Sequence, residues 1–128
     1  MPIPRLRPTK AELEILRVLW KEGPLSVREV LNVLTASRPT GYTSVLKTMQ
    51  IMTEKGLVTR DDSRRPQVYE ARNSEERTQK QLLGDLIQRA YGGSVKTLVM
   101  HAVGTTRPSA RDLEAIEKLL DRFERGKK

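Results

Sequence analysis

The chain has 128 residues, enough for one compact domain or two small ones, and 37% of them are hydrophobic, so it can bury a core. The lack of cysteine excludes disulfides, thiolate catalysis and cysteine-bound zinc, and the single histidine, His101, excludes metal sites built from several histidines. We therefore expect no enzyme, no cofactor and no metal. With 24 Lys and Arg against 16 Asp and Glu the formal net charge is +8, which favours a polyanionic partner without identifying one. Residues 1–19 contain no unbroken apolar run, so we expect neither a signal peptide nor a membrane partner, but a cytoplasmic protein.

The first part of the chain predicts two helices. Each begins with a capping box, Thr9 with Glu12 and Ser26 with Glu29, in which the hydroxyl caps backbone N–H groups and the glutamate returns the bond. Apolar residues follow each box at spacings of three and four, so each helix has one wide apolar face. The pair Gly23-Pro24 separates the two helices.

A third helix is expected from Tyr42 to Lys55, with Gly56 as its left-handed C-cap. After it, the period of the apolar residues changes. Residues 57–60 and 67–71 predict two strands, and the polar residues between them predict a turn. Three helices followed by a hairpin are typical of a winged helix-turn-helix, although other folds share this order of elements.

The sequence beyond residue 72 is helical in character. Asn73 is expected to cap a long helix that ends at Gly92-Gly93, and a short helix follows over residues 94–102, ending near Gly104. Ser109, with an aspartate three residues later, is expected to open a last helix. These segments total about 50 residues, too few to bury a stable core alone.

The apolar faces of these C-terminal helices therefore need another surface. They could pack back on the first domain, or two copies of the chain could complete one helical core between them, and we favour the second alternative. We expect a mainly α fold with a small β-hairpin wing, in which a winged helix-turn-helix over 1–72 precedes a helical dimerisation domain over 73–128. The residues expected in the dimer are Leu82, Leu86, Ile87, Leu98, Val99, Leu113, Ile116, Leu120 and Phe123.

The third helix carries the strongest indication of function. At 100° per residue, Val45, Met49 and Met52 form an apolar arc with Tyr42 beside it. The outward arc carries short hydroxyl side chains near the helix start, where backbone N–H groups also meet phosphates, followed by side chains long enough to reach base edges. An ordinary solvated face has the same pattern. The candidates are Thr43, Ser44, Lys47 and Gln50.

Five arginines are further candidates for DNA contact. Arg64 and Arg65 stand at the hairpin tip and Arg60 on the strand before it, where a wing touches the backbone or the minor groove. Arg28 on the second helix and Arg38 in the turn after it could reach flanking phosphates. Two aspartates in the hairpin turn offset part of this charge, and a decorated surface turn remains the alternative.

Three segments of the chain resemble the BlaI/MecI penicillinase-repressor family. They are residues 9–20 (TKAELEILRVLW), the third helix with its C-cap over 42–58, and residues 91–99 (YGGSVKTLV). The motifs keep their order and spacing, and the similarity spans residues 8–123. The resemblance implies a winged-helix domain, a C-terminal dimerisation domain, and a transcriptional repressor that occupies a palindromic operator in duplex DNA as a homodimer. It also implies that Thr43, Ser44 and Lys47 lie on the recognition helix.

The chain departs from the family pattern at points that concern mechanism. Ile51 stands where an arginine is common, so the operator sequence is not carried over. The family's Asn-Phe cleavage pair is replaced by His101-Ala102, so inactivation by proteolysis is not carried over either. The cysteine motif of the copper-responsive branch is missing, which excludes that mode of sensing. The alternative function is a winged-helix module that binds protein instead of DNA; the regulated genes and the inducing signal are not readable from the chain.

Overall fold

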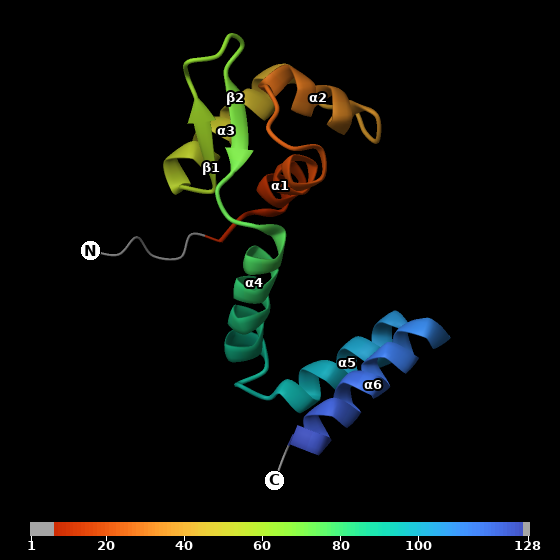
Figure 1. Cartoon of the computed structure of the whole chain (residues 1–128). Coiled ribbons are helices and arrows are strands. Elements are labelled where there is room, and N and C mark those ends of the chain that lie inside the picture. The colour runs from red at the N-terminus through yellow and green to blue at the C-terminus, as the bar shows by residue number, and fades with distance from the viewer. Residues whose placement is uncertain (1–6, 127–128) are drawn as a thin grey trace, which may run out of the picture. The chain divides into compact units, whose positions relative to one another are not determined.

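The computed structural model describes residues 7–126, and this part of the chain has six helices and one two-stranded antiparallel hairpin (Figure 1). The expected mainly α fold with a small β wing is thereby confirmed. The elements are α1 (Lys10–Glu22), α2 (Val27–Thr35), α3 (Tyr42–Lys55), β1 (Val58–Asp61), β2 (Val68–Ala71), α4 (Glu75–Ala90), α5 (Val95–Thr106) and α6 (Ala110–Gly126). The chain forms two compact units that divide between Leu82 and Leu83, inside α4, whereas the sequence suggested a domain boundary after residue 72.

Both capping boxes are present at the starts of α1 and α2. The N–H of Thr9 donates to Oε1 of Glu12 at 2.8 Å, and the N–H of Glu12 donates back to Oγ1 of Thr9 at 3.2 Å. Ser26 and Glu29 repeat the exchange at 2.9 and 3.2 Å. Each box satisfies backbone N–H groups that the helix itself leaves without a partner, so the local sequence alone is enough to start both helices.

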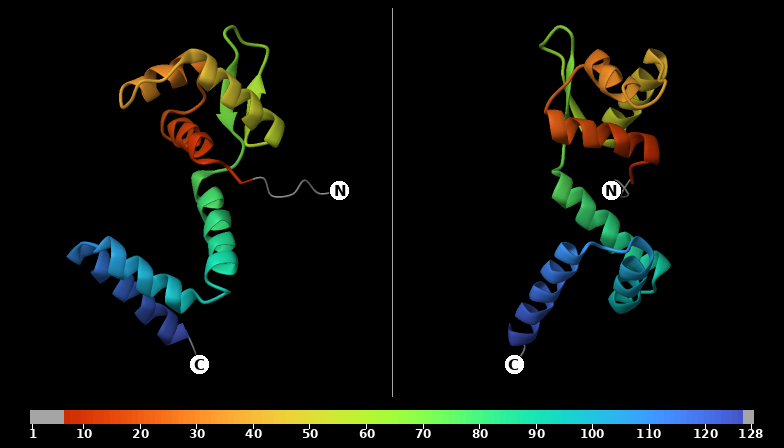
Figure 2. Two further views of the ribbon diagram at one scale, coloured as in Figure 1. Left: turned by 180° about the vertical axis from the view of Figure 1, so that it is seen from behind. Right: turned by 90° about the vertical axis from the view of Figure 1, so that its right-hand side faces the viewer.

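The core of the first unit lies between α1, α2, α3 and the hairpin. The apolar stripe of α3 faces it, and Gly56 ends the helix with a φ of 80°, a left-handed conformation that suits glycine. Figure 2 shows α3 lying against α2 and beside the hairpin. The buried apolar residues are Ile15, Leu16, Leu19, Val27, Val30, Leu31, Leu34, Val45, Met49, Met52, Val58 and Tyr69.

The hairpin pairs Val58 with Ala71 and Asp61 with Val68 in antiparallel register. A third short segment, which the sequence did not indicate, joins it between α1 and α2. There the N–H of Leu25 donates to the carbonyl oxygen of Tyr69 at 3.0 Å, and Leu25 accepts the N–H of Tyr69 at 2.8 Å. These two hydrogen bonds attach the hairpin to the segment between α1 and α2. The buried side chain of Tyr69 attaches the hairpin to the core as well.

Two details of the later helices differ from expectation. Ser74, and not Asn73, caps α4. Its Oγ accepts the N–H of Arg77 at 3.1 Å. The carbonyl oxygen of Asn73 accepts the indole N–H of Trp20 instead, at 2.9 Å. Helix α5 does not end near Gly104 but continues to Thr106, because one glycine costs a helix only about 1 kcal/mol relative to alanine. Ser109 caps α6 as expected, accepting the N–H of Asp112 at 3.1 Å.

Helices α5 and α6 contain no buried residue. Their large apolar side chains are half-buried or exposed, up to Phe123, which is 69% exposed. Helices α5 and α6 therefore do not fully bury one another's apolar side chains. Within residues 7–126, none of the helices combines the length and the apolar composition needed to cross a bilayer.

Candidate nucleic-acid interface

The outer face of α3 is a polar surface of the first unit. Thr43, Ser44, Lys47 and Gln50 are all exposed on it, opposite the buried stripe of the same helix. None of these four side chains makes a hydrogen bond or an ion pair with another residue of 7–126. The structure thus brings together all four residues expected on this helix, with their donors and acceptors available to a partner.

The start of α3 has no side-chain cap. Gly41 is the N-cap residue, and no side chain accepts the N–H groups of the first turn. Such N–H groups, with the positive end of the helix dipole, are well suited to a phosphate oxygen. The hydroxyls of Thr43 and Ser44 stand in the same turn.

The Arg28 side chain of α2 reaches the first residue of α3. Its guanidinium carbon lies 4.6 Å from the centre of the Tyr42 ring, which is cation–π geometry. Tyr42 is 40% exposed and was placed only beside the apolar arc by the sequence. Its contact with Arg28 escaped sequence reasoning because it joins two helices, and helical periodicity reports only which residues share a face of one helix.

Arg38 lies in the turn after α2 and is paired with Glu14 of α1. The distance from Nη2 of Arg38 to Oε1 of Glu14 is 2.8 Å, and both side chains are more than a third exposed. Exposed ion pairs of this kind contribute about 0–1 kcal/mol, so a phosphate can compete for the guanidinium. Arg38 therefore remains accessible, with part of its charge compensated.

In the hairpin, the arginines are ordered by their neighbours. Nε of Arg60 lies 2.6 Å from Oδ1 of Asp62, and the hydrogen bond with Asp62 raises the pKa of Arg60 above its usual value, with a smaller contribution from Tyr69. Arg65 donates from Nη1 to the backbone carbonyl oxygens of Asp62 at 3.0 Å and of Arg64 at 3.5 Å. Bonds to neutral carbonyls hold the Arg65 side chain without cancelling its charge.

The other aspartate of the turn is bound locally. Oδ1 of Asp61 accepts both the hydroxyl of Ser63 at 2.6 Å and its backbone N–H at 3.0 Å. These hydrogen bonds, with the nearby charge of Arg64, hold the pKa of Asp61 below its usual 3.8. Both acidic side chains of the turn thus have partners inside the hairpin.

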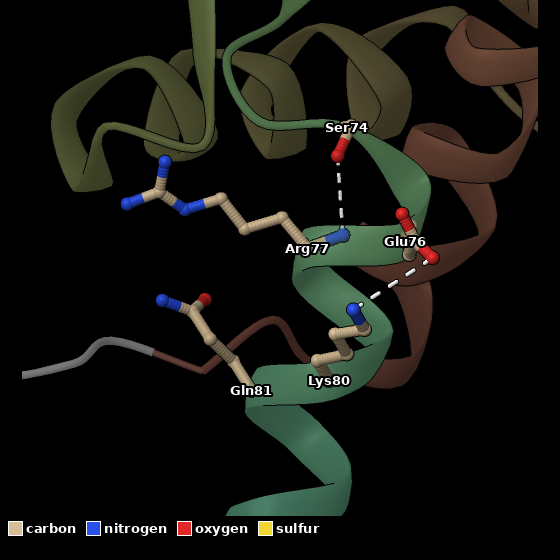
Figure 3. A pocket seen from close by; sticks show the side chains of 5 residues that line it. All are labelled: Ser74, Glu76, Arg77, Lys80 and Gln81. Carbon is tan, nitrogen blue, oxygen red and sulfur yellow. Dashed lines mark hydrogen bonds and ion pairs between the residues drawn. The ribbon is translucent and has the colours of Figure 1, made fainter.

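A hollow of about 400 Å³ lies at the start of α4 and is lined by Ser74, Glu76, Arg77, Lys80 and Gln81. Figure 3 shows Arg77 and Gln81 extending to one side of the helix, while Lys80 turns back toward Glu76, 3.8 Å away. All five lining residues are exposed and polar, and none is one of the hydrophobic or aromatic residues that line a typical small-molecule site.

The residues expected in the dimer lie on α4, α5 and α6, and the structure leaves them at least partly accessible. Leu82, Ile87, Leu98 and Ile116 are half-buried, and the exposed ones are Leu86, Val99, Leu113, Leu120 and Phe123. Four more exposed apolar residues occur on the same helices, outside the set expected in the dimer: Leu83, Val95, Met100 and Leu119. Leu119 lies three residues after Ile116, a spacing that keeps both on one helix face.

Two comparisons with known proteins agree with these features. The family model described as penicillinase repressor matches residues 8–122, nearly the whole chain. The penicillinase repressor of Bacillus licheniformis is 21% identical over 118 residues, which cover 92% of this chain and 92% of that protein. The resemblance seen in the sequence is thereby confirmed. The chain belongs to the penicillinase repressor family, a family of DNA-binding transcriptional repressors with a winged-helix fold.

Proposed function

We propose that this protein represses transcription by binding a palindromic operator in duplex DNA as a homodimer. The observation that carries the proposal is the outer face of α3, where four polar side chains are exposed and make no hydrogen bond or ion pair with other described residues. In a helix-turn-helix, the recognition helix enters the major groove and reads base edges with such side chains. This function requires the protein to be in the cytoplasm together with DNA.

The polar residues of the first unit divide into two roles. Lys47 and Gln50 stand beyond the first turn of α3 and are long enough to read base edges. Thr43 and Ser44 lie beside the uncapped backbone N–H groups and bind phosphate. The five arginines, Arg28, Arg38, Arg60, Arg64 and Arg65, bind phosphates on either side and set the position of the unit on the duplex.

The exposed apolar residues of the second unit support the homodimer. Leucines and a phenylalanine are exposed on three successive helices. Exposed apolar residues in such numbers favour burial against another apolar surface. A second copy supplies the same surface through a two-fold axis. Two recognition helices related by that axis match a palindromic operator.

The alternative function is a winged-helix module that binds protein. It would need an apolar or hot-spot-rich face on the first unit. The exposed residues of α3 carry hydroxyls, an amide, an ammonium group and the carboxylate of Glu54, and only Tyr42 and Ile51 add large apolar side chains. This composition supports the DNA-binding function.

The test is enrichment of genomic DNA fragments on the purified chain, followed by fluorescence anisotropy with an enriched duplex. A dimer that neutralises roughly 6–10 phosphates should lose about 10³–10⁵ in affinity between about 50 and 200 mM salt. Lys118→Ala is a control for charge alone, because Lys118 is exposed in the second unit and faces Glu114 3.5 Å away. It should bind like the unaltered chain, while Lys47→Ala should bind more weakly. No enrichment of any fragment, or binding that does not respond to salt, would refute the proposal.

A further inference from the structure

Tyr42 is the first residue of α3, and its side chain lies outside the core. It is 40% exposed, whereas Val45, the next residue of the apolar arc, is 3% exposed. The ring instead contacts Arg28, whose guanidinium carbon lies 4.6 Å from the ring centre. Arg28 is in the first turn of α2, so the pair connects the starts of the two helices of the helix-turn-helix.

The ring holds Arg28 in a different way from the other arginines near the proposed DNA surface. Arg38 is paired with Glu14 and Arg60 with Asp62, so each gives N–H donors and part of its charge to a carboxylate. Arg28 makes no hydrogen bond or ion pair with any residue of 7–126. An aromatic ring contacts the face of a guanidinium and leaves both the N–H donors at its edge and its charge available to another acceptor.

We propose that Tyr42 is a positioning residue for DNA binding, whose ring holds the Arg28 guanidinium in place to bind a phosphate of the duplex backbone. The inference rests on the proposed function. In a helix-turn-helix, the helix before the recognition helix crosses the sugar–phosphate backbone, and Arg28 stands in the first turn of that helix. A planar guanidinium binds phosphate through two parallel N–H groups, and fixing it beforehand reduces the side-chain entropy lost on binding.

A double-mutant cycle on the full chain tests this role. Tyr42→Leu removes the ring, Tyr42→Phe removes only the hydroxyl, and Arg28→Met keeps most of the apolar stem of the side chain but removes the charge. The probe is a labelled duplex of about 30 base pairs of arbitrary sequence at about 50 mM salt, because a phosphate contact carries no sequence information. Anisotropy gives the affinity of each variant, and Trp20 fluorescence during urea unfolding checks that each variant is folded.

The inference predicts that Tyr42→Leu weakens binding by about two- to fivefold for each winged-helix unit bound to the duplex, the range expected for an exposed cation–π contact. Tyr42→Phe should bind like the unaltered chain, because the ring is retained. In the Arg28→Met background, Tyr42→Leu should have no further effect. Tyr42→Gln, a second variant without the ring, should show the same dependence on Arg28 even where Tyr42→Leu folds poorly.

Two results would overturn the inference and leave the proposed function intact. One is an equal loss from Tyr42→Leu with and without Arg28, which would show that the residues act independently. The other is a loss in Tyr42→Phe as large as that in Tyr42→Leu, which would assign the effect to the hydroxyl. Failure of the unaltered chain to bind any duplex would overturn the proposed function, and this inference with it.

Discussion

Lys55, the last residue of α3, is attached to the first turn of α1 by a buried ion pair, and Lys55→Met should strongly destabilise the first unit. Nζ of Lys55 lies 2.6 Å from Oε1 of Glu12, and the side chains are only 18% and 4% exposed. The same oxygen accepts the N–H of Thr9 at 2.8 Å. Without the ammonium group, the nearly buried Glu12 carboxylate would lose the cation that is paired with it.

The size of the effect follows from this burial. Removing one partner of a buried ion pair costs about 3–5 kcal/mol of folding stability. Because the Lys55 ammonium is partly hydrated and the Thr9 N–H still bonds the carboxylate, we expect the lower end, about 3 kcal/mol. The matched control is Lys80→Met. Lys80 and Glu76 are 3.8 Å apart with side chains 75% and 80% exposed, so its loss should change stability by no more than about 0.5 kcal/mol.

Urea unfolding at one protein concentration, followed by the fluorescence of Trp20, measures the difference. Trp20 is the only tryptophan of the chain and lies in α1, so its signal reports the first unit. Glu12→Gln combined with Lys55→Met should recover part of the loss, because no buried charge then lacks a partner. Equal midpoints for Lys55→Met and Lys80→Met would refute the reasoning.

Three further predictions concern the surfaces. Lys47→Ala should reduce the preference for operator over random duplex by about 1–3 kcal/mol, whereas Arg65→Ala should weaken binding to both duplexes alike. Anisotropy titrations with both duplexes measure this, and the same behaviour in both variants would contradict the assignment of the recognition helix. Leu120→Asp places an unpaired charge in the expected dimer surface, so sedimentation at micromolar concentration should show monomers, with operator affinity lower by about 10²–10⁴; a persistent dimer would contradict that surface. Asp61 should titrate below pH 3.8 in an NMR experiment, and Ser63→Ala should raise the pKa of Asp61. The lowered pKa means that the ionised carboxylate stabilises the hydrogen-bonded turn above pH 3.8 and that this contribution is lost as the pH falls through the pKa of the folded state. A titration midpoint at or above 3.8 would argue against these hydrogen bonds.

The sequence alone was sufficient wherever the signal acts over a few residues. The capping boxes at Thr9 and Ser26, the stop at Gly56 and the polar outer face of α3 were all readable, because a cap spans three residues and a helix face repeats every three to four. The start of α4 was predicted one residue too early, because Asn73 and Ser74 are adjacent and both are good N-cap residues. The indole N–H of Trp20, 53 residues away in the chain, donates to the backbone carbonyl oxygen of Asn73, and the side chain of Ser74 caps the helix.

Tertiary structure alone decided which charged and aromatic side chains pair when they are far apart in the chain. Arg38 and Glu14 are 24 residues apart in the chain, and Lys55 and Glu12 are 43 apart, so no local pattern relates them. The contact between Arg28 and Tyr42 likewise exists only because α2 packs on α3. Composition and periodicity report which face of an element a residue occupies; the partner of that residue depends on which element packs against that face, and this is set by the burial of the whole core.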